Sequence, residues 1–333
     1  MRYSWILFFT LLAFSLDLLA LPTAKITVKV INEDGEPVEG ATAGAGFTMP
    51  VKTGWGSRAT GESGLTDSNG LFSAEGETEQ YGLGYSAIKD GYYRSFNKYN
   101  KFNEAKGILG FRKWQPWNLT VELTLKEIKK PVPLYVVTMG SIYRPLEIPK
   151  LGKFIGFDLV ARDWVAPYGT GAHEDFLFKI SGEFDPSPLY VDQTLVLKFN
   201  NPHDGIQSRF IKPDVGSVLR MPFHAPEDGY DNELTLRSKG DSKQHFITYH
   251  RDDQNFFFRV RTKTDDNGNI ISALYGKIHG EISFTIGTLR EPDKSSIHFT
   301  FYLNPVPNDT NLEFDPKKNL FKDIESGEKI RQP

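Results

Sequence analysis

Four carboxylates lie close together in one aromatic stretch of the chain, GFDLVARDWVAPYGTGAHEDF. They are Asp158, Asp163, Glu174 and Asp175, with Trp164, Tyr168 and His173 beside them. Glycoside hydrolysis needs only two carboxyl groups several ångströms apart, so these four are the candidate catalytic residues of a glycan-acting hydrolase. Charged residues on strand faces are ordinarily solvated and not catalytic, and the leading expectation is that no residue of the chain is catalytic.

A second stretch, residues 94–118, mixes aromatic and basic side chains without a clean strand or helix period. Aromatic faces can stack on sugar rings, and neighbouring cations can bind anionic groups. The candidate ligand-binding residues are Tyr99, Arg112, Trp114 and Trp117 from this stretch, and Trp55 from a glycine-rich segment. The alternative is that the tryptophans are buried against a second domain, since large aromatic residues are mostly buried.

Other catalytic and metal-binding patterns are absent or incomplete. The chain has no cysteine, which excludes a thiol nucleophile and cysteine-ligated zinc, and it contains neither HExxH nor GxSxG. His224 and Glu227 have the HxxE spacing of metallocarboxypeptidase zinc ligands, but Pro222 and Pro226 fit a loop. Residues 265–269, DDNGN, begin like a calcium loop without its downstream glutamate, which favours a hairpin turn. We expect no metal and no cofactor.

The first 24 residues have the composition of a secretory signal peptide. One arginine precedes an apolar run from Trp5 to Leu16, which is too short to span a bilayer, and small residues surround Ala20 and Ala24. We therefore expect a secreted or periplasmic protein without a transmembrane segment in its mature chain. The formal net charge of −3 does not favour nucleic acid as a partner.

Strand and turn patterns dominate the region after the signal peptide. In residues 25–31 the apolar residues Ile26, Val28 and Val30 alternate with polar ones, the pattern of a half-buried strand. Asp67 and Gly70 lie between two apolar runs and predict a tight turn. With 13% aromatic residues, 30 Gly and 20 Pro, the chain favours many strands and turns.

The chain contains, in this order, a strand and the segments DGEPVEGA, TDSNGLF and KDGYY. This order resembles the carboxypeptidase regulatory-like domain, a transthyretin-like β-sandwich of secreted bacterial proteins. The match is carried by Asp34, Gly35, Pro37, Val38, Gly40, Ala41, Thr66, Asp67, Gly70, Phe72, Lys89, Gly91, Tyr92 and Tyr93. The resemblance implies a small β-sandwich over residues 25–128 with a scaffold or recognition role, and it transfers no active site. Residues 40–64 are glycine-rich and are expected to form a loop between strands, as is the segment after Ser95.

Residues 129–133, KKPVP, predict a stiff linker. Beyond it, residues 134–321 contain strand-like runs such as DFLFKI, TLVLKF and NFFFRVRT, which predict a larger antiparallel β-sandwich or jelly roll. In the last of these runs, Phe256, Phe258 and Val260 should face the core, with Arg259 and Arg261 on the other face. Residues 322–333 are expected to form a polar, fraying tail. The layout of residues 134–321 is similar to that of exported bacterial chains that carry the same N-terminal domain. This similarity does not imply an activity.

The sequence therefore favours an exported all-β protein of two domains that binds carbohydrate or another extracellular macromolecule without catalysis. Two alternatives stay open: a structural component of the cell envelope whose partner is a protein, and a glycan-acting hydrolase. The expected partner is accordingly a polysaccharide or an envelope protein.

Overall fold

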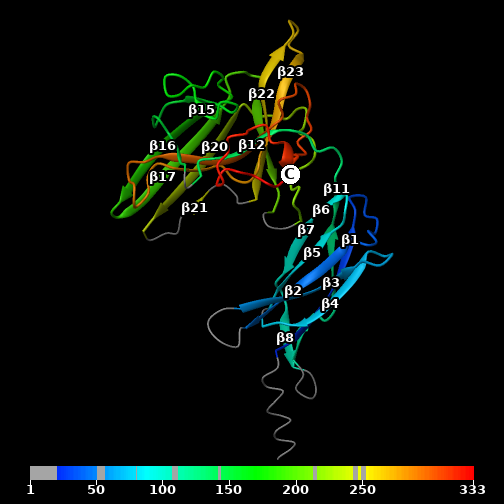
Figure 1. Ribbon diagram of the computed structural model, residues 1–333. Helices are drawn as coiled ribbons and strands as arrows, with labels where there is room; N and C mark the ends of the chain where they lie inside the picture. The colour runs from blue at the N-terminus through cyan, green and yellow to red at the C-terminus, as the bar shows by residue number, and fades with distance from the viewer. Residues whose placement is uncertain are drawn as a thin grey trace, which may run out of the picture. The chain divides into compact units, whose positions relative to one another are not determined.

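The computed structural model describes residues 21–50, 57–79, 81–106, 112–141, 144–212, 216–242, 247–248 and 253–333. In these residues the chain is all β, and a single 3-10 turn, η3 (Pro316–Lys318), is the one helical element (Figure 1). The expected all-β class is confirmed. The chain divides into unit 1, residues 1–128 with Asp214–Val218, and unit 2, Lys129–Pro213 with Leu219–Pro333.

Unit 1 is a sandwich of two sheets around one core. Its strands are β1 (Thr23–Ile31), β2 (Thr42–Pro50), β3 (Ser57–Leu65), β4 (Leu71–Glu77), β5 (Leu83–Ile88), β6 (Tyr92–Tyr93), β7 (Ser95–Tyr99), β8 (Asn103–Lys106), β9 (Arg112–Gln115), β10 (Leu119–Thr124), β11 (Lys126–Glu127) and β19 (Gly216–Ser217). One sheet has the order β10-β1-β9-β8 with β4 also on β1, and the other has the order β19-β7-β5-β2-β3. Val28, Ala45 and Tyr85 bring both sheets to the same core.

Several expectations for unit 1 were wrong. The glycine-rich segment forms the paired strands β2 and β3 instead of a loop, because Ala43, Ala45 and Phe47 alternate with small residues and fill the core. The segment after Ser95 contains β7, β8 and β9. β1 begins at Thr23, and Ala24 is fully buried, so both residues belong to the sandwich although they were assigned to the signal peptide.

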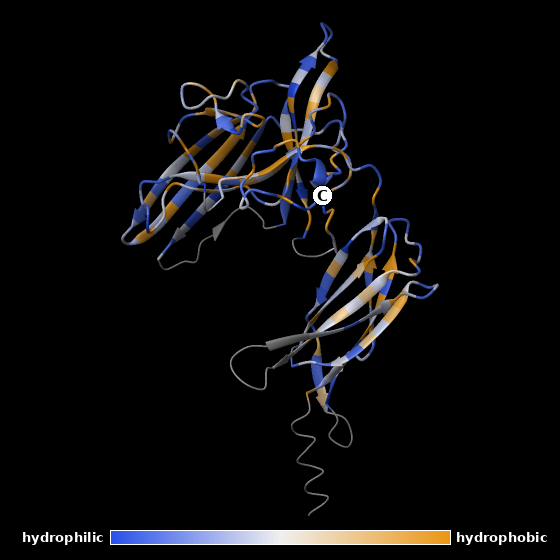
Figure 2. Cartoon of the chain, viewed as in Figure 1, coloured by the Kyte–Doolittle hydropathy of each residue, from blue (hydrophilic) through white to orange (hydrophobic). Residues whose placement is uncertain are grey.

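Unit 2 contains two larger sheets. Its strands are β12 (Tyr135–Met139), β13 (Leu146–Glu147), β14 (Ile155–Asp158), β15 (Asp163–Trp164), β16 (Phe176–Pro186), β17 (Leu189–Lys198), β18 (Gly205–Phe210), β20 (Glu233–Asp241), β21 (Ile247–Thr248), β22 (Gln254–Thr264), β23 (Ile270–Ile278), β24 (Ser283–Thr285) and β25 (Ser296–Leu303). One sheet has the order β12-β25-β23-β22-β18, with β13 and β24 on β25, and the other β15-β14-β16-β17-β20-β21. Along β17 buried positions alternate with partly exposed ones, and the strands of unit 2 carry many apolar residues (Figure 2).

The sheet that contains β22 is buried on both faces. Phe256, Phe258 and Val260 face the main core of unit 2, as predicted. Phe257 lies in a second core with Leu312 and Phe314, and Arg259 is also buried, so the opposite face of β22 is covered as well. The chain after β25 folds back over this face and covers it.

Residues 322–333 pack against unit 2 and do not form a frayed tail. Glu328 is 3% exposed, and its backbone carbonyl accepts a hydrogen bond of 3.0 Å from the Thr138 amide. Ile324 packs against the main core, and the Tyr302 hydroxyl donates to the carbonyl of Gln332. These apolar and backbone contacts outweigh the polar composition on which the expectation rested.

The predicted turns are present. Gly70 and Gly268 have φ values of 72° and 83°, which suit glycine. The Asp67 carboxylate accepts the amides of Asn69 and Leu71, and Asp265 accepts those of Asn267 and Asn269. Residues 265–269 therefore join β22 to β23 as an Asx turn. No helix within the described ranges is long and apolar enough to cross a bilayer.

Candidate functional site: a glycine-floored groove on unit 1

The structure does not bring the aromatic and basic candidates of residues 94–118 together on one surface. Trp114 is 8% exposed, and its indole N–H donates to the carbonyl of Thr78 at 2.9 Å. It packs beside Phe102 in the core of unit 1 itself, not against a second domain. Trp114 is therefore a core residue and cannot stack on a ligand.

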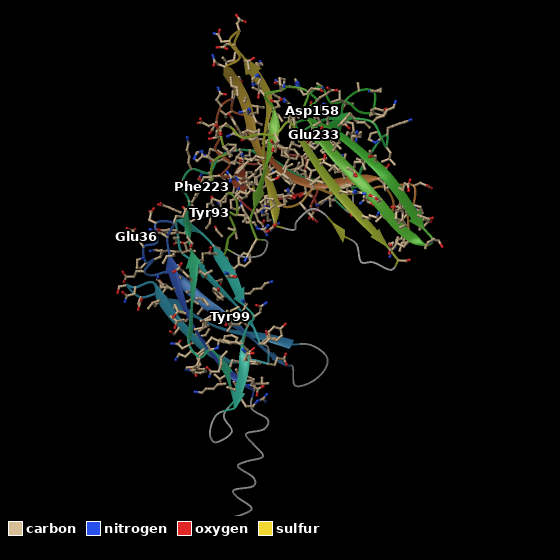
Figure 3. All side chains as sticks on the ribbon, turned by 180° about the vertical axis from the view of Figure 1, so that it is seen from behind. Glu36, Tyr93, Tyr99, Asp158, Phe223 and Glu233 are labelled. Carbon is tan, nitrogen blue, oxygen red and sulfur yellow. The ribbon has the colours of Figure 1, made fainter. Side chains whose placement is uncertain are left out.

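The remaining candidates are scattered. The Arg112 guanidinium binds the Glu104 carboxylate through two N–H groups, one of them at 2.9 Å. Trp117 is half-buried, with the Lys113 ammonium 4.2 Å from its ring centroid. Tyr99 on β7 is half-buried as well and packs edge-on against Phe102 (Figure 3). Trp55 lies outside the described residues.

A substitution at Trp114 should reduce stability. Trp114→Phe removes the hydrogen bond to the buried Thr78 carbonyl and leaves a gap, so we expect a loss of about 2 kcal/mol in the free energy of unfolding. The matched change Trp117→Phe at the half-exposed position should cost less than about 0.5 kcal/mol. Urea denaturation of both variants measures the difference, and equal stabilities would contradict the core role of Trp114.

Two of the four acidic candidates, Asp158 and Asp175, form a buried ion network around one arginine. The Arg261 guanidinium binds both oxygens of Asp175, at 2.7 and 2.8 Å, and one oxygen of Asp158 at 3.1 Å. Asp158, at the end of β14 (Figure 3), also accepts the amides of Val160, Ala161, Ala172 and His173. The network connects the segment between β14 and β16 to β22. Asp158 and Asp175 therefore have a structural role.

The other two acidic candidates lie apart from this network. Asp163 accepts hydrogen bonds from the Trp164 amide and from the amide and hydroxyl of Thr170. Glu174 is exposed and accepts a hydrogen bond from the Asn200 side chain. Asp204, which the sequence did not single out, accepts the backbone amides of Arg261 and Thr262 beneath the network.

The pKa directions argue against a glycosidase acid. Burial raises the pKa of Asp158, but backbone hydrogen bonds from Ala161, Ala172 and His173 and the charge of Arg261 outweigh it, so the pKa lies below its usual value. For Asp163, hydrogen bonds from Thr170 and Trp164 likewise outweigh burial and lower the pKa. A general acid of a glycosidase needs a raised pKa, so neither carboxyl suits that role.

The ionised Asp158 should make stability depend on pH. The pKa of Asp158 in the folded state lies below its value in the unfolded state, which is about 3.9. The ionised carboxylate therefore stabilises the fold above that pH, and this stabilisation is lost as the pH falls through the folded-state pKa. We expect the stability difference between the wild type and Asp158→Asn to be constant from about pH 7 to pH 5 and to shrink below about pH 4. Denaturant titrations across this range measure it, and a difference that is unchanged at pH 2 would contradict the assignment.

The outer face of the sheet β19-β7-β5-β2-β3 carries the feature with the clearest functional meaning. Ala43, Ala45 and Phe47 of β2 point into the core, so Gly44 and Gly46 lie on the opposite, outer face. Gly61 of β3 and Gly84 of β5 are directly opposite Gly46 in the ladders and share this face. We call Gly44, Gly46, Gly61 and Gly84 the glycine floor.

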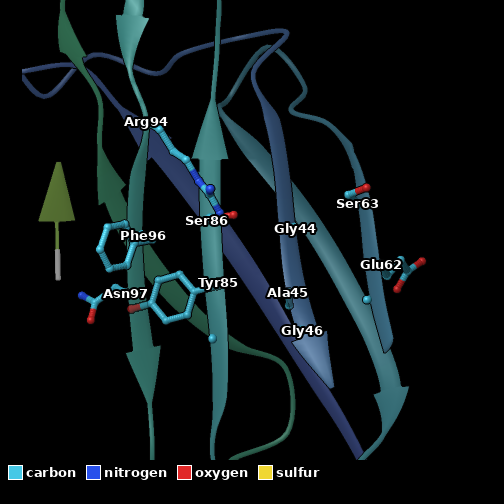
Figure 4. Close-up of a pocket in the computed structure, with 12 residues that line it drawn as sticks. Gly44, Ala45, Gly46, Glu62, Ser63, Tyr85, Ser86, Arg94, Phe96 and Asn97 are labelled. Atoms are coloured by element: carbon cyan, nitrogen blue, oxygen red, sulfur yellow. The ribbon is translucent and has the colours of Figure 1, made fainter. Parts of the chain in front are cut away.

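A hollow lies over the glycine floor. A cavity of about 480 Å³ is lined by the four glycines together with Ser63, Ser86, Arg94 and Phe96 (Figure 4). A second hollow of about 530 Å³ shares Gly84 and is lined by Tyr81, Lys98 and Tyr99. Since neighbouring strands are spaced by about 4.8 Å, the floor extends roughly 10 Å across three strands. Together these hollows form the glycine groove.

The fold itself does not require two of these glycines. None of the four has a positive φ. A Cβ atom on Gly46 or Gly84 would have no neighbour nearer than 3.9 Å, whereas one on Gly44 would lie 2.9 Å from the carbonyl of Glu62. Glycine inside a strand is destabilising, and it often marks a place where a ligand approaches the backbone closely. Gly46 and Gly84 thus keep open a space that the described part of the chain does not fill.

The side of the groove formed by β7 supplies chemical groups for recognition. Arg94, Phe96 and Lys98 alternate along the chain, and Ser86 is paired with Phe96 in the ladder. Among the described residues, the guanidinium of Arg94 and the ammonium of Lys98 have no ion-pair partner. In Figure 4 the Arg94 side chain extends toward Ser86. The groove therefore combines an aromatic ring, hydroxyl groups and two cations.

The predicted recognition stretch, residues 94–118, contributes Arg94, Phe96, Lys98 and Tyr99 to the groove, but sequence reasoning missed the glycine floor although a signal was present. The alternation of Ala43, Ala45 and Phe47 with glycine is the period of a strand, with alanine in the place of larger apolar residues. The alternation of Arg94, Phe96 and Lys98 was interpreted as an irregular loop. Because no bulky residue marked the outer face, the pattern lacked the contrast on which strand prediction depends.

Comparison with known proteins adds little. No family model matches the chain, and no curated protein matches it. Among solved structures it is similar to the 3-chlorocatechol 1,2-dioxygenase of Rhodococcus opacus 1CP at 10% sequence identity and a TM-score of 0.25. The match covers 33% of this chain and 61% of that one, so the chain spans less than two thirds of the dioxygenase. A likeness of this size carries no argument about activity.

Proposed function

We propose that the chain is an exported recognition protein whose glycine groove binds a carbohydrate chain that carries acidic groups. The observation that carries the proposal is the unfilled space over Gly46 and Gly84, which neither backbone conformation nor internal packing explains. A shallow floor of backbone lets a flat sugar ring approach closely, and Phe96 offers an aromatic contact beside it. The resemblance to the carboxypeptidase regulatory-like domain, a non-catalytic module, is in keeping with this role.

The charges of the groove favour an acidic ligand over a neutral one. Arg94 and Lys98 contribute two cations. The one carboxylate of the lining, Glu62, accepts a hydrogen bond from the Glu75 amide on β4. Salt screens the attraction between the exposed cations of the groove and the acidic groups of a ligand. Binding should therefore weaken as the salt concentration rises.

Export forms part of the same proposal. The apolar run of residues 5–16 supports passage through a secretory route to the periplasm or the exterior. Because β1 begins at Thr23, cleavage after Ala20 would leave the sandwich of unit 1 complete. N-terminal sequencing of the protein purified from the producing cell tests this position.

The experiment that tests the function is a screen of residues 21–333 on arrayed neutral and acidic polysaccharides, with release of reducing sugar assayed on the same compounds. We expect binding of acidic polysaccharides that weakens with salt, and no turnover. Failure to bind any saccharide would overturn the proposal and favour a structural envelope protein. Turnover abolished by changes at the carboxylates of unit 2 would favour a hydrolase instead.

A further inference from the structure

A small cavity in unit 2 contains a buried carboxylate oxygen that no described group satisfies. The cavity, of about 170 Å³, is lined by Arg144, Arg162, Asp163 and Glu328, with Met139 and Leu146 among its apolar lining. The Oε2 atom of Glu328 is buried and has no hydrogen-bond partner in the described part of the chain. Its other oxygen, Oε1, lies 3.8 Å from the Arg144 guanidinium, too far for a hydrogen bond. A buried carboxylate oxygen without a donor is costly, so a donor is expected from outside the described residues.

The position of Glu328 is fixed by the fold. Its amide donates to the carbonyl of Glu325, and its carbonyl accepts the amide of Thr138 on β12, both at 3.0 Å. The side chain is only 4% exposed. These backbone contacts thus place the carboxylate in the cavity.

The charges around the cavity balance one another. Arg144 and Arg162 oppose Asp163 and Glu328. Both oxygens of Asp163 already accept hydrogen bonds, and Arg162 donates to the Asp323 carbonyl and lies over the Phe321 ring. The Glu328 carboxylate and the largely exposed Arg144 guanidinium make no side-chain hydrogen bond within the described residues. They are one acceptor and one donor of opposite charge.

We propose that this cavity binds a small zwitterion of the α-amino-acid class. An ammonium group supplies the missing donor to Oε2 of Glu328, and a carboxylate pairs with Arg144. The apolar lining suits a short aliphatic side chain. At about 30 Å³ for each water molecule in the liquid, the cavity has room for about five waters, which limits the ligand to a small solute. No group of three metal-ligating side chains occurs in the described ranges, and the arginines disfavour a bare cation.

Calorimetric titration of residues 21–333 with L-alanine, L-valine and N,N,N-trimethylglycine tests this inference. We expect saturable binding of the amino acids at one site, and binding of the trimethylated compound that is at least about tenfold weaker, because it has no N–H donor. Glu328→Gln should weaken amino-acid binding by about tenfold or more without lowering the melting temperature, since it removes a buried charge that lacks a hydrogen bond.

The matched control is Glu325→Gln, an exposed position in the same segment, which should bind like the wild type. Three results would overturn the inference: no saturable binding of either amino acid, equal affinity for the trimethylated compound, or a Glu328→Gln variant that binds normally. Any of them would mean that the ammonium of an amino acid is not the donor to Glu328. The site is separate from the glycine groove, so its failure leaves the proposed function untouched.

Discussion

The double variant Gly46→Val/Gly84→Val should lose polysaccharide binding while its fold becomes no less stable. Val side chains at these positions enter the glycine groove, where a Cβ atom at either position would have its nearest protein neighbour 3.9 Å away. Filling space that a ligand occupies costs about 1–3 kcal/mol at each position, so affinity should fall by about 30-fold or more. Replacing strand glycines should in turn stabilise the fold by about 0.5–1 kcal/mol each.

This opposite movement of affinity and stability identifies the groove as a binding site. A core position would lose stability together with binding, and a passive surface would lose neither. Affinity on an acidic polysaccharide and the midpoint of thermal unfolding should be measured for the same preparation. Gly84→Ala is a milder companion that should be stable and should weaken binding less.

Thr120→Val provides the matched control. Thr120 is an exposed residue of β10, in the other sheet of unit 1, so the change adds the same side chain away from the groove. It should bind like the wild type. If the double variant also bound like the wild type, the groove would not be the ligand site. If it unfolded, the space over Gly46 and Gly84 would not be free.

The amino-acid pattern predicted those parts of the fold that depend on local information. The Asx turns at Asp67 and Asp265 and the alternation of Phe256, Phe258 and Val260 follow from neighbouring residues alone, and the structure contains them. Strands β2 and β3 were missed because their outer positions are glycine. The burial of Phe257 was missed because it depends on Leu312 and Phe314, which are distant in sequence.

The candidate sites failed for a related reason. A tryptophan in a mixed aromatic and basic stretch has the same composition whether it is exposed or buried, and only the contact of Trp114 with Thr78 decides. The carboxylates Asp158 and Asp175 were recognised as a cluster, but their partner Arg261 is 103 and 86 positions away. The sequence identifies which side chains could bind a ligand or act in catalysis. Long-range contacts determine which of them are already bound to other groups of the protein.

The second large effect is expected at Asp175. This carboxylate is 1% exposed and binds Arg261 through two hydrogen bonds, so Asp175→Ala leaves a half-buried guanidinium with Asp158 as its one ionic partner among the described residues. Removing one partner of a buried pair typically costs about 3–5 kcal/mol, and we expect a loss of that order in the free energy of unfolding. The exposed neighbour offers the control Glu174→Gln, which should cost less than about 0.5 kcal/mol.

A double-mutant cycle separates the ion pair from other roles of Asp175. Arg261→Met removes the charge that Asp175→Ala leaves uncompensated, so the double variant should be more stable than the sum of the two single losses predicts, by about 1–3 kcal/mol. The Asp175 carboxylate also accepts a hydrogen bond from the Leu159 amide. Additive losses would show that Asp175 acts through this hydrogen bond and not through Arg261. Because the network holds the loop between β14 and β16, loss of any activity in Asp175→Ala must be judged against its folded fraction. Coupled losses at Asp175 and Arg261 would thus assign these carboxylates to the architecture of unit 2 and not to catalysis.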